Sequence, residues 1–212
     1  MGVTRMSSEA AHFREPVSRA VLDQVAVRLR ERNMEGIIVS DASQARDAVL
    51  ERLPAGAEVH AGKSKTLQEI GVTLVLAADG KYNYLRNIYL KMDRETQKQE
   101  IRKLIAAPDY MLGSVSAVTR DGILVAASAT ASQLGPYAVG GGKVILVVGS
   151  QKVVPDLDSA FARIREYVLP WEDSQVQAAM GINSFVGKIL IIEREWVAGR
   201  ITVLLVQQPV GI

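Results

Sequence analysis

The sequence KVILVVGSQK, residues 143–152, decides the fold class. Its apolar part, residues 144–148, consists of aliphatic side chains that are mostly β-branched. An unbroken run of this kind is typical of a parallel strand that is covered on both faces. Glycine and three polar residues follow at 149–152, at the strand end where open α/β sheets bind ligands. We therefore expect a central parallel strand at 144–148 and a ligand-binding edge directly after it.

Helices and strands alternate on both sides of this segment. The spacing of the apolar residues in 17–29 predicts a helix, and the short apolar run at 36–40 predicts a strand. Residues 110–118 are typical of one strand, with 123–126 returning beside it after a hairpin-type turn at 120–122. We therefore expect the α/β class, a Rossmann-like three-layer α/β/α fold whose mostly parallel sheet carries antiparallel additions.

Three local predictions complete the fold. Residues 72–77 fit either a strand or a continued helix. We expect Pro170 to end the helix that begins near residue 157, because proline removes a helical hydrogen bond. The apolar runs at 188–192 and 201–206 are expected to form a closing antiparallel pair.

The length and composition indicate a single domain. The chain has 212 residues, 48% of them hydrophobic, which is enough for one substantial core. Residues 1–15 are polar and of mixed charge, so we expect a loose tail there and one domain over 16–212. These first residues lack the apolar core of a signal peptide, and 144–148 is too short to span a bilayer. We expect a cytoplasmic protein without a membrane partner.

Composition also excludes several chemistries. The net charge of +2 implies no strong positive field, so we expect no nucleic-acid partner. The chain has no cysteine, which excludes thiolate catalysis, cysteine-bound zinc and iron–sulfur clusters in this chain. His12 and His60 are far apart without ligand spacing, so we expect no metal site. No G-x-G-x-x-G sequence is present, and we expect no cofactor.

The sequence AGKSKTLQEIG, residues 61–71, predicts an anion pocket. It passes from a short strand into a short helix, and such a turn exposes backbone N–H groups to a negative group. It resembles the end of a phosphate-binding P-loop, but that motif needs a glycine where this chain has Ala57. The wrong spacing argues against a nucleotide triphosphatase. The sequence thus indicates an anion without naming it.

Polar residues at four predicted strand ends form the expected binding site. Since ligands bind beyond the carboxyl ends of parallel strands, we expect these segments to converge. The predicted ligand-binding residues are Gly62, Lys63, Ser64, Thr66, Ser114, Ser116, Ser132, Gln133 and Lys152. Lysines among them would pair with a carboxylate or phosphate.

For several other residues the sequence allows both a functional and a structural interpretation. Glu69 is the one candidate catalytic residue, as a general base or a nucleophile, but Thr66 and Glu69 also fit a capping box. His60, at a strand end beside the pocket, is better explained by packing than by catalysis. Trp171 and Trp196 fit packing anchors or the interface of a homo-oligomer.

The chain resembles the LUD domain, the lactate-utilisation domain of LutC-type proteins. The matching segments follow the family's order over roughly residues 20–210, and they are 62–71, 113–122, 129–137, 143–157, 187–192 and 199–203. The resemblance implies a fold like the NagB/RpiA/CoA-transferase group. Where relatives commonly carry a Gly-Asn-Arg-type turn, this chain has Ser132-Gln133-Leu134, so a role resting on that Asn or Arg does not transfer.

The resemblance implies a role in the conversion of lactate to pyruvate. It would make the protein an accessory that binds a small anionic ligand, a carboxylate or phosphate, or a partner subunit such as the iron–sulfur proteins of lactate utilisation. The alternative is an enzyme that acts on a phosphorylated or acyl (CoA-like) small molecule, as relatives of the fold do. Fold alone does not decide between them.

Overall fold

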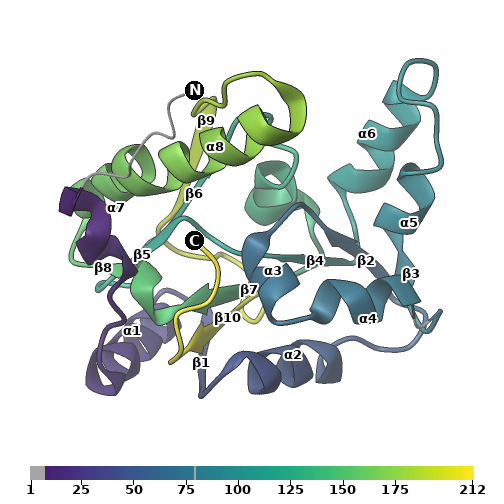
Figure 1. Cartoon of the computed structure of the whole chain (residues 1–212). Helices are drawn as coiled ribbons and strands as arrows, with labels where there is room; N and C mark the ends of the chain where they lie inside the picture. The colour runs from purple at the N-terminus through teal and green to yellow at the C-terminus, as the bar shows by residue number, and fades with distance from the viewer. Residues whose placement is uncertain (1–7, 79) are drawn as a thin grey trace.

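The structure, a computed structural model that describes residues 8–78 and 80–212, is built on a six-stranded parallel sheet (Figure 1). Its strand order is β1-β10-β7-β4-β2-β3, and every neighbouring pair in it is parallel. The strands are β1 (Glu35–Val39), β2 (Glu58–Ala61), β3 (Asn83–Tyr84), β4 (Tyr110–Gly113), β7 (Lys143–Gly149) and β10 (Ile201–Val206). The prediction of a central strand at 144–148 is confirmed, since β7 lies between β10 and β4.

Helices lie on both faces of this sheet and outside the second sheet described below. They are α1 (Arg19–Glu31), α2 (Ala42–Glu51), α3 (Lys65–Glu69), α4 (Val72–Ala78), α5 (Leu85–Tyr89), α6 (Lys98–Ala106), α7 (Leu157–Arg163) and α8 (Leu169–Met180), with short 3-10 or π segments η1 (Ser8–Arg14), η2 (Pro136–Gly140), η3 (Ser150–Lys152) and η4 (Ile164–Val168). The arrangement is the predicted three-layer α/β/α fold. The region at 72–77, left open by the sequence, is helical as α4.

The side chains of β7 alternate between two cores. Val144, Leu146 and Val148 pack with α1 on one face of the sheet. Ile145 and Val147 pack with α2, α3 and α4 on the other face. A strand buried on both faces needs apolar side chains at every position, which is the physical reason for the unbroken run in the sequence.

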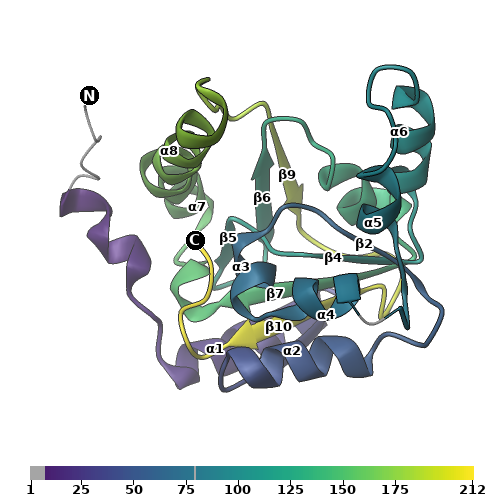
Figure 2. The ribbon, with the colours of Figure 1, turned by 45° about the vertical axis from the view of Figure 1, so that its right-hand side comes forward.

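A second, four-stranded sheet lies between the main sheet and α7–α8 (Figure 2). Its order is β8-β5-β6-β9, and the remaining strands are β5 (Ala117–Thr119), β6 (Leu124–Ser128), β8 (Val153–Val154) and β9 (Lys188–Ile192). The β5–β6 pair is antiparallel, as predicted. The expected strand at 110–118 is instead divided, because its first part pairs in the main sheet and its last part in the second.

The closing antiparallel pair does not form. β10 inserts between β1 and β7 and is parallel to both, whereas β9 pairs with β6 in the second sheet. All six residues of β10 are buried, so this strand needs a covered position in the middle of the main sheet.

Pro170 does not end its helix. The chain stays helical from Leu157 to Met180, and a π-helical segment, η4, directly precedes the proline. A π segment shifts the hydrogen-bonding pattern by one residue, which accommodates the missing proline N–H within a continuous helix.

The expected loose tail is structured over residues 8–14. This segment is the 3-10 helix η1, and its side chains Ala10 and Phe13 are buried against Tyr167 of η4. Burial of Phe13 supplies the apolar contact that a loose tail would lack. Residues 1–7 lie outside the described part. Within residues 8–78 and 80–212, no helix is long and apolar enough to cross a membrane.

Candidate functional site

The candidate site lies where the chain passes twice from the main sheet to the second sheet. Residues 114–116 connect β4 to β5, and residues 150–152 connect β7 to β8. Because β4 and β7 are neighbouring parallel strands, both connections leave the same edge of the main sheet. This topology brings Ser114 and Lys152 together, with the side chain of Thr66 from α3 beside them.

Lys152 is the centre of the site. Its Nζ donates hydrogen bonds to Thr66 Oγ1 at 2.9 Å and to Ser114 Oγ at 3.0 Å. The residue is 2% exposed, and burial, followed by the charge of Arg163, lowers the pKa of its amine to about 7, while Glu69 acts in the opposite sense. At neutral pH the amine is therefore divided between its charged and its neutral form.

Arg163 is a second buried cation beside Lys152. It has no exposed surface and projects from α7 against Tyr167, whose ring centroid is 5.2 Å from the guanidinium carbon. One of its nitrogens, Nη1, donates to the carbonyl oxygen of Ser116, whereas Nε and Nη2 have no hydrogen-bond partner among the residues that the structure describes. Burial lowers the pKa of Arg163 to about 10, so the group stays charged at neutral pH.

Tyr137 fixes the backbone of Ser114. Its hydroxyl accepts a hydrogen bond from the Ser114 N–H and donates one to the Ser114 carbonyl, both at 3.2 Å. The ring is 2% exposed and rests against Gly113, where a Cβ would overlap the tyrosine hydroxyl. This close approach therefore requires a glycine at position 113. Burial also raises the pKa of the Tyr137 hydroxyl.

The segment 207–212, which we call the strap, covers the site. Ser150 Oγ donates to the carbonyl of Gln207 at 2.6 Å, and Gln151 Nε2 donates to the carbonyl of Val210 at 3.0 Å. The N–H of Gly211 donates to Glu69 Oε2. Figures 1 and 2 both show this yellow segment ending beside α3. The strap thus covers the site on the side next to α3.

Gly211 lets the strap approach the buried hydroxyl and amine. It has φ +75°, and an added Cβ would overlap Thr66 Oγ1 and lie 3.0 Å from Lys152 Nζ. We expect Gly211→Ala to displace the strap and to lower the free energy of unfolding by about 2 kcal/mol more than its control, because overpacking costs about 1–3 kcal/mol.

The matched control for that variant is Gly199→Ala. Gly199 has φ +70°, and no atom of the described residues lies within 4 Å of its added Cβ, so this variant costs only the backbone strain of an alanine in the left-handed region. Urea unfolding measures both stabilities, and hydrogen exchange of residues 207–212 measures the displacement. Equal losses in the two variants, with an unchanged exchange rate in the strap, would contradict the expected contact.

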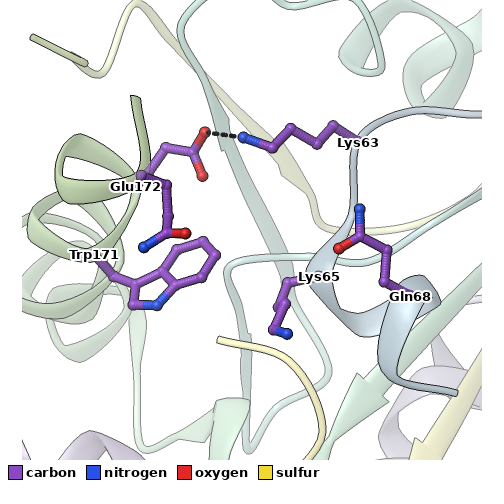
Figure 3. A pocket seen from close by; sticks show the side chains of 6 residues that line it. Lys63, Lys65, Gln68, Trp171 and Glu172 are labelled. Atoms are coloured by element: carbon purple, nitrogen blue, oxygen red, sulfur yellow. Dashed lines mark hydrogen bonds and ion pairs between the residues drawn. The ribbon is translucent and has the colours of Figure 1, made fainter. Parts of the chain in front are cut away.

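A cleft of about 160 Å³ lies beside the strap, between α3 and α8. It is lined by Lys63, Lys65, Gln68, Trp171, Glu172 and Gln175. Figure 3 shows Lys63 and Glu172 reaching toward each other from opposite walls, with a nitrogen–oxygen distance of 3.4 Å. Lys65 pairs with Glu69 at 3.4 Å. The lysines of this cleft are therefore already balanced by carboxylates, unlike Lys152 and Arg163.

The capping box predicted for Thr66 and Glu69 is wrong. Ser64 is the N-cap of α3, since its hydroxyl accepts from the Leu67 N–H at 3.3 Å. Thr66 lies inside the helix and is 1% exposed, with its hydroxyl turned to Lys152. Glu69 holds the strap instead of a helix end. The helix starts two residues earlier than the capping box predicted, and this places Thr66 in the site instead of at the cap.

The other predicted binding residues surround the same edge. Gly62, Lys63 and Ser64 line a second cleft of about 220 Å³. An added Cβ on Gly62 would lie 3.9 Å from Gln133 Cβ, which places the loop after β6 next to the turn between β2 and α3. Gln133 itself accepts from the hydroxyls of Ser128 and Ser132. The four strand ends therefore converge, but within the described residues the side chains of Ser132 and Gln133 bond to each other, to Ser128 and to Thr130.

Two predicted residues have structural partners. Ser116 Oγ accepts from the Ala127 N–H at 3.1 Å and so supports the β5–β6 pair. His60 is 2% exposed and meets the edge of the Tyr89 ring at 5.8 Å between centroids. Burial, together with the charge of Arg86, lowers the pKa of His60 to about 4. Within residues 8–78 and 80–212, no three His, Asp or Glu side chains cluster as metal ligands would.

Arg163, Tyr137 and the strap were missed by sequence reasoning. The sequence did contain an indication for Arg163, because the spacing of Ala160, Ile164 and Tyr167 puts Arg163 on the buried face of α7 and η4. A charged residue on an apolar helix face indicates either a buried function or a partner. No local pattern identifies Tyr137 or the strap.

The fold and site define a class: an α/β protein with two buried cations at the carboxyl edge of a parallel sheet. The chain belongs to the LUD domain family, which it matches over residues 22–206. Among solved structures it is similar to a DUF162 family protein from Deinococcus radiodurans, with a TM-score of 0.53 and 14% sequence identity, over 90% of this chain and 99% of that chain. No curated protein matches the chain.

Proposed function

We propose that this protein is a LutC-like accessory in the conversion of lactate to pyruvate that binds a small carboxylate or phosphate at Lys152 and Arg163. Membership of the LUD domain family supports a role associated with lactate utilisation. The observation that supports the binding site is the buried Arg163 beside the buried Lys152, since Nε and Nη2 of Arg163 have no hydrogen-bond partner in residues 8–78 and 80–212.

A bound anion would remove an electrostatic cost of the unliganded fold. Within the described residues, neither Lys152 nor Arg163 forms an ion pair with a carboxylate. A buried charge is costly unless it is paired, and Arg163 offers two free N–H directions to a planar carboxylate or a phosphate. The ligand therefore belongs to the class of small anions.

Thermal unfolding with lactate, pyruvate and inorganic phosphate tests this proposal. An anion present at about 100 times its Kd stabilises the fold by about 2.7 kcal/mol, which for a chain of this size raises Tm by about 5–10 °C. Lactamide, a neutral analogue of lactate, is expected to give no shift because it lacks the charge.

The variants Lys152→Met and Lys188→Met form the matched pair for this experiment. Lys188 is exposed at the start of β9, so its loss leaves the anion-dependent shift unchanged. Lys152→Met is expected to remove most of the shift. A full shift in Lys152→Met, or an equal shift with lactamide, would contradict anion binding at this site.

The pH dependence of binding gives an independent readout. An anion favours the charged amine, so binding takes up a proton above the free-protein pKa of about 7. Arg163 and Glu69 are the charged groups that act on this amine, and Arg163 stays charged over the same range. We expect the anion to bind several-fold more weakly at about pH 8.5 than at about pH 6.5.

The partner proposed with this function is an iron–sulfur protein of lactate utilisation. Exposed apolar side chains on the far end of α8 and the loop after it support a protein contact, and they include Met180, Ile182 and Phe185. Copurification of an iron–sulfur protein with the full chain, and its loss in a Phe185→Asp variant, would test the partnership. Retention of the same protein by that variant would argue against this surface.

A further inference from the structure

The pair formed by Ser114 and Lys152 has a geometry that anion binding does not use. Ser114 Oγ and Lys152 Nζ are 3.0 Å apart, within reach for direct proton transfer. Among residues 8–78 and 80–212, the one carbonyl that accepts from the serine hydroxyl is that of Val115, at 3.4 Å and at the outer limit of a hydrogen bond. The hydroxyl proton is therefore free to turn toward the amine once the amine is neutral.

The serine is more accessible than the lysine, as a nucleophile must be more accessible than its general base. Ser114 is half-buried, whereas Lys152 is 2% exposed and lies behind it. Thr66 also bonds to Lys152 but is 1% exposed, so a substrate meets the serine before the threonine. Tyr137 holds both backbone polar groups of Ser114 and acts as a positioning residue.

We propose that Ser114 is a nucleophile for acyl transfer, that Lys152 is its general base, and that the substrates are esters or thioesters of small carboxylic acids. A buried amine beside another cation is a recognised means of keeping a lysine neutral near pH 7. This activity goes beyond anion binding and uses the opposite protonation state of the same lysine.

The chemistry balances with the groups at the site and water. The Ser114 hydroxyl oxygen bonds to the acyl carbon while its proton passes to Nζ of neutral Lys152. The bond from the acyl carbon to the leaving oxygen or sulfur then breaks, and the leaving group takes that proton from Nζ. Water hydrolyses the resulting serine ester, with Lys152 accepting a proton from the water and returning one to Ser114 Oγ. Arg163 supplies nearby positive charge for the oxyanion.

Labelling of the full chain with diisopropyl fluorophosphate tests the nucleophile without a known substrate. We expect one diisopropylphosphoryl adduct per chain by intact mass, with fluoride released, and peptide mass spectrometry is expected to place it on Ser114. The labelling rate should rise with pH and reach half its maximum near the Lys152 pKa of about 7, because only the neutral amine accepts the proton.

Three variants decide the assignment. Ser114→Ala is expected to give no adduct, and Lys152→Met is expected to slow labelling by about 100-fold or more, the usual worth of a general base. Ser174→Ala removes an exposed serine of α8 whose side chain, among the described residues, bonds to Trp171 and Gln175 of the same helix, and this variant should label like the unchanged protein. Circular dichroism checks that each variant is folded.

Labelling of the Ser114→Ala protein, absence of an adduct on the unchanged protein, or a rate that does not depend on pH would each overturn the proposal. If Lys152→Met fails to fold, the pH profile of the unchanged protein and the Ser114→Ala result still decide it. The two proposals can fail independently, because anion binding is measured by Tm and the nucleophile by the mass of the adduct. Their pH dependences are also opposite, since anion binding weakens above pH 7 whereas labelling becomes faster.

Discussion

Gly113→Ala is expected to lower the free energy of unfolding by about 3 kcal/mol, the upper end of the usual cost of overpacking. The new Cβ would overlap the Tyr137 hydroxyl and lie 2.6 Å from Cζ of its ring. Gly113 belongs to β4, between β2 and β7, and the tyrosine is 2% exposed, so neither side can move into free space. Displacement of the ring also removes both hydrogen bonds to Ser114.

Gly135→Ala is the matched control, because nothing lies within 4 Å of its added Cβ and its φ of −59° suits alanine. Urea unfolding of both variants measures the difference. In a Tyr137→Leu background the Gly113→Ala change should cost much less, since the two residues are coupled through one contact. An undiminished cost in that background would show that the glycine is needed for another reason.

Lys152→Met is expected to change how stability depends on pH. The folded amine has a pKa of about 7, against a reference of 10.5 for the unfolded chain, so between these values the unfolded state binds more protons. Stability of the unchanged protein therefore rises with pH in this window, by up to about 1.4 kcal/mol per pH unit. From about pH 7.5 to 9.5 it should gain roughly 2.5 kcal/mol that the variant does not gain.

The measurement is urea unfolding of both proteins at several pH values between about 7.5 and 9.5. Subtracting the variant cancels the other titrating groups, and Lys188→Met serves as the control that should keep the full slope. Arg163, with a pKa near 10, begins to titrate near the upper end of this window, and the subtraction removes its contribution because both proteins contain it. Parallel pH curves for the unchanged protein and Lys152→Met would mean that the buried amine keeps an ordinary pKa.

The order of the strands could be predicted only in part. Local chemistry is sufficient for β7, because a strand covered on both faces needs an apolar residue at every position. Local sequence chemistry does not determine which strands pair with β10. Its sequence fits an antiparallel hairpin with β9 as well as the parallel place between β1 and β7 that it takes, and only long-range pairing decides between them.

The predicted pocket shows a similar division. Of its residues, Thr66, Ser114 and Lys152 are in direct hydrogen-bonding contact. The sequence placed the most weight on Gly62, Lys63 and Ser64, but Lys63 pairs with Glu172 and Ser64 caps a helix. Residues that look alike in a sequence, such as Lys63 and Lys152, differ in the structure by their burial and by their partners.

The sequence by itself determined the family, the α/β class, the central strand and the edge of the sheet that carries polar residues. These features depend on local patterning, which side-chain period and turn chemistry impose. Only the tertiary structure decided that Lys152 is buried, that Arg163 from a distant helix lies beside it, and that residues 207–212 close over Lys152. Burial and charge pairing join residues that are far apart in the chain, and they alone set the pKa and the reactivity of an amine.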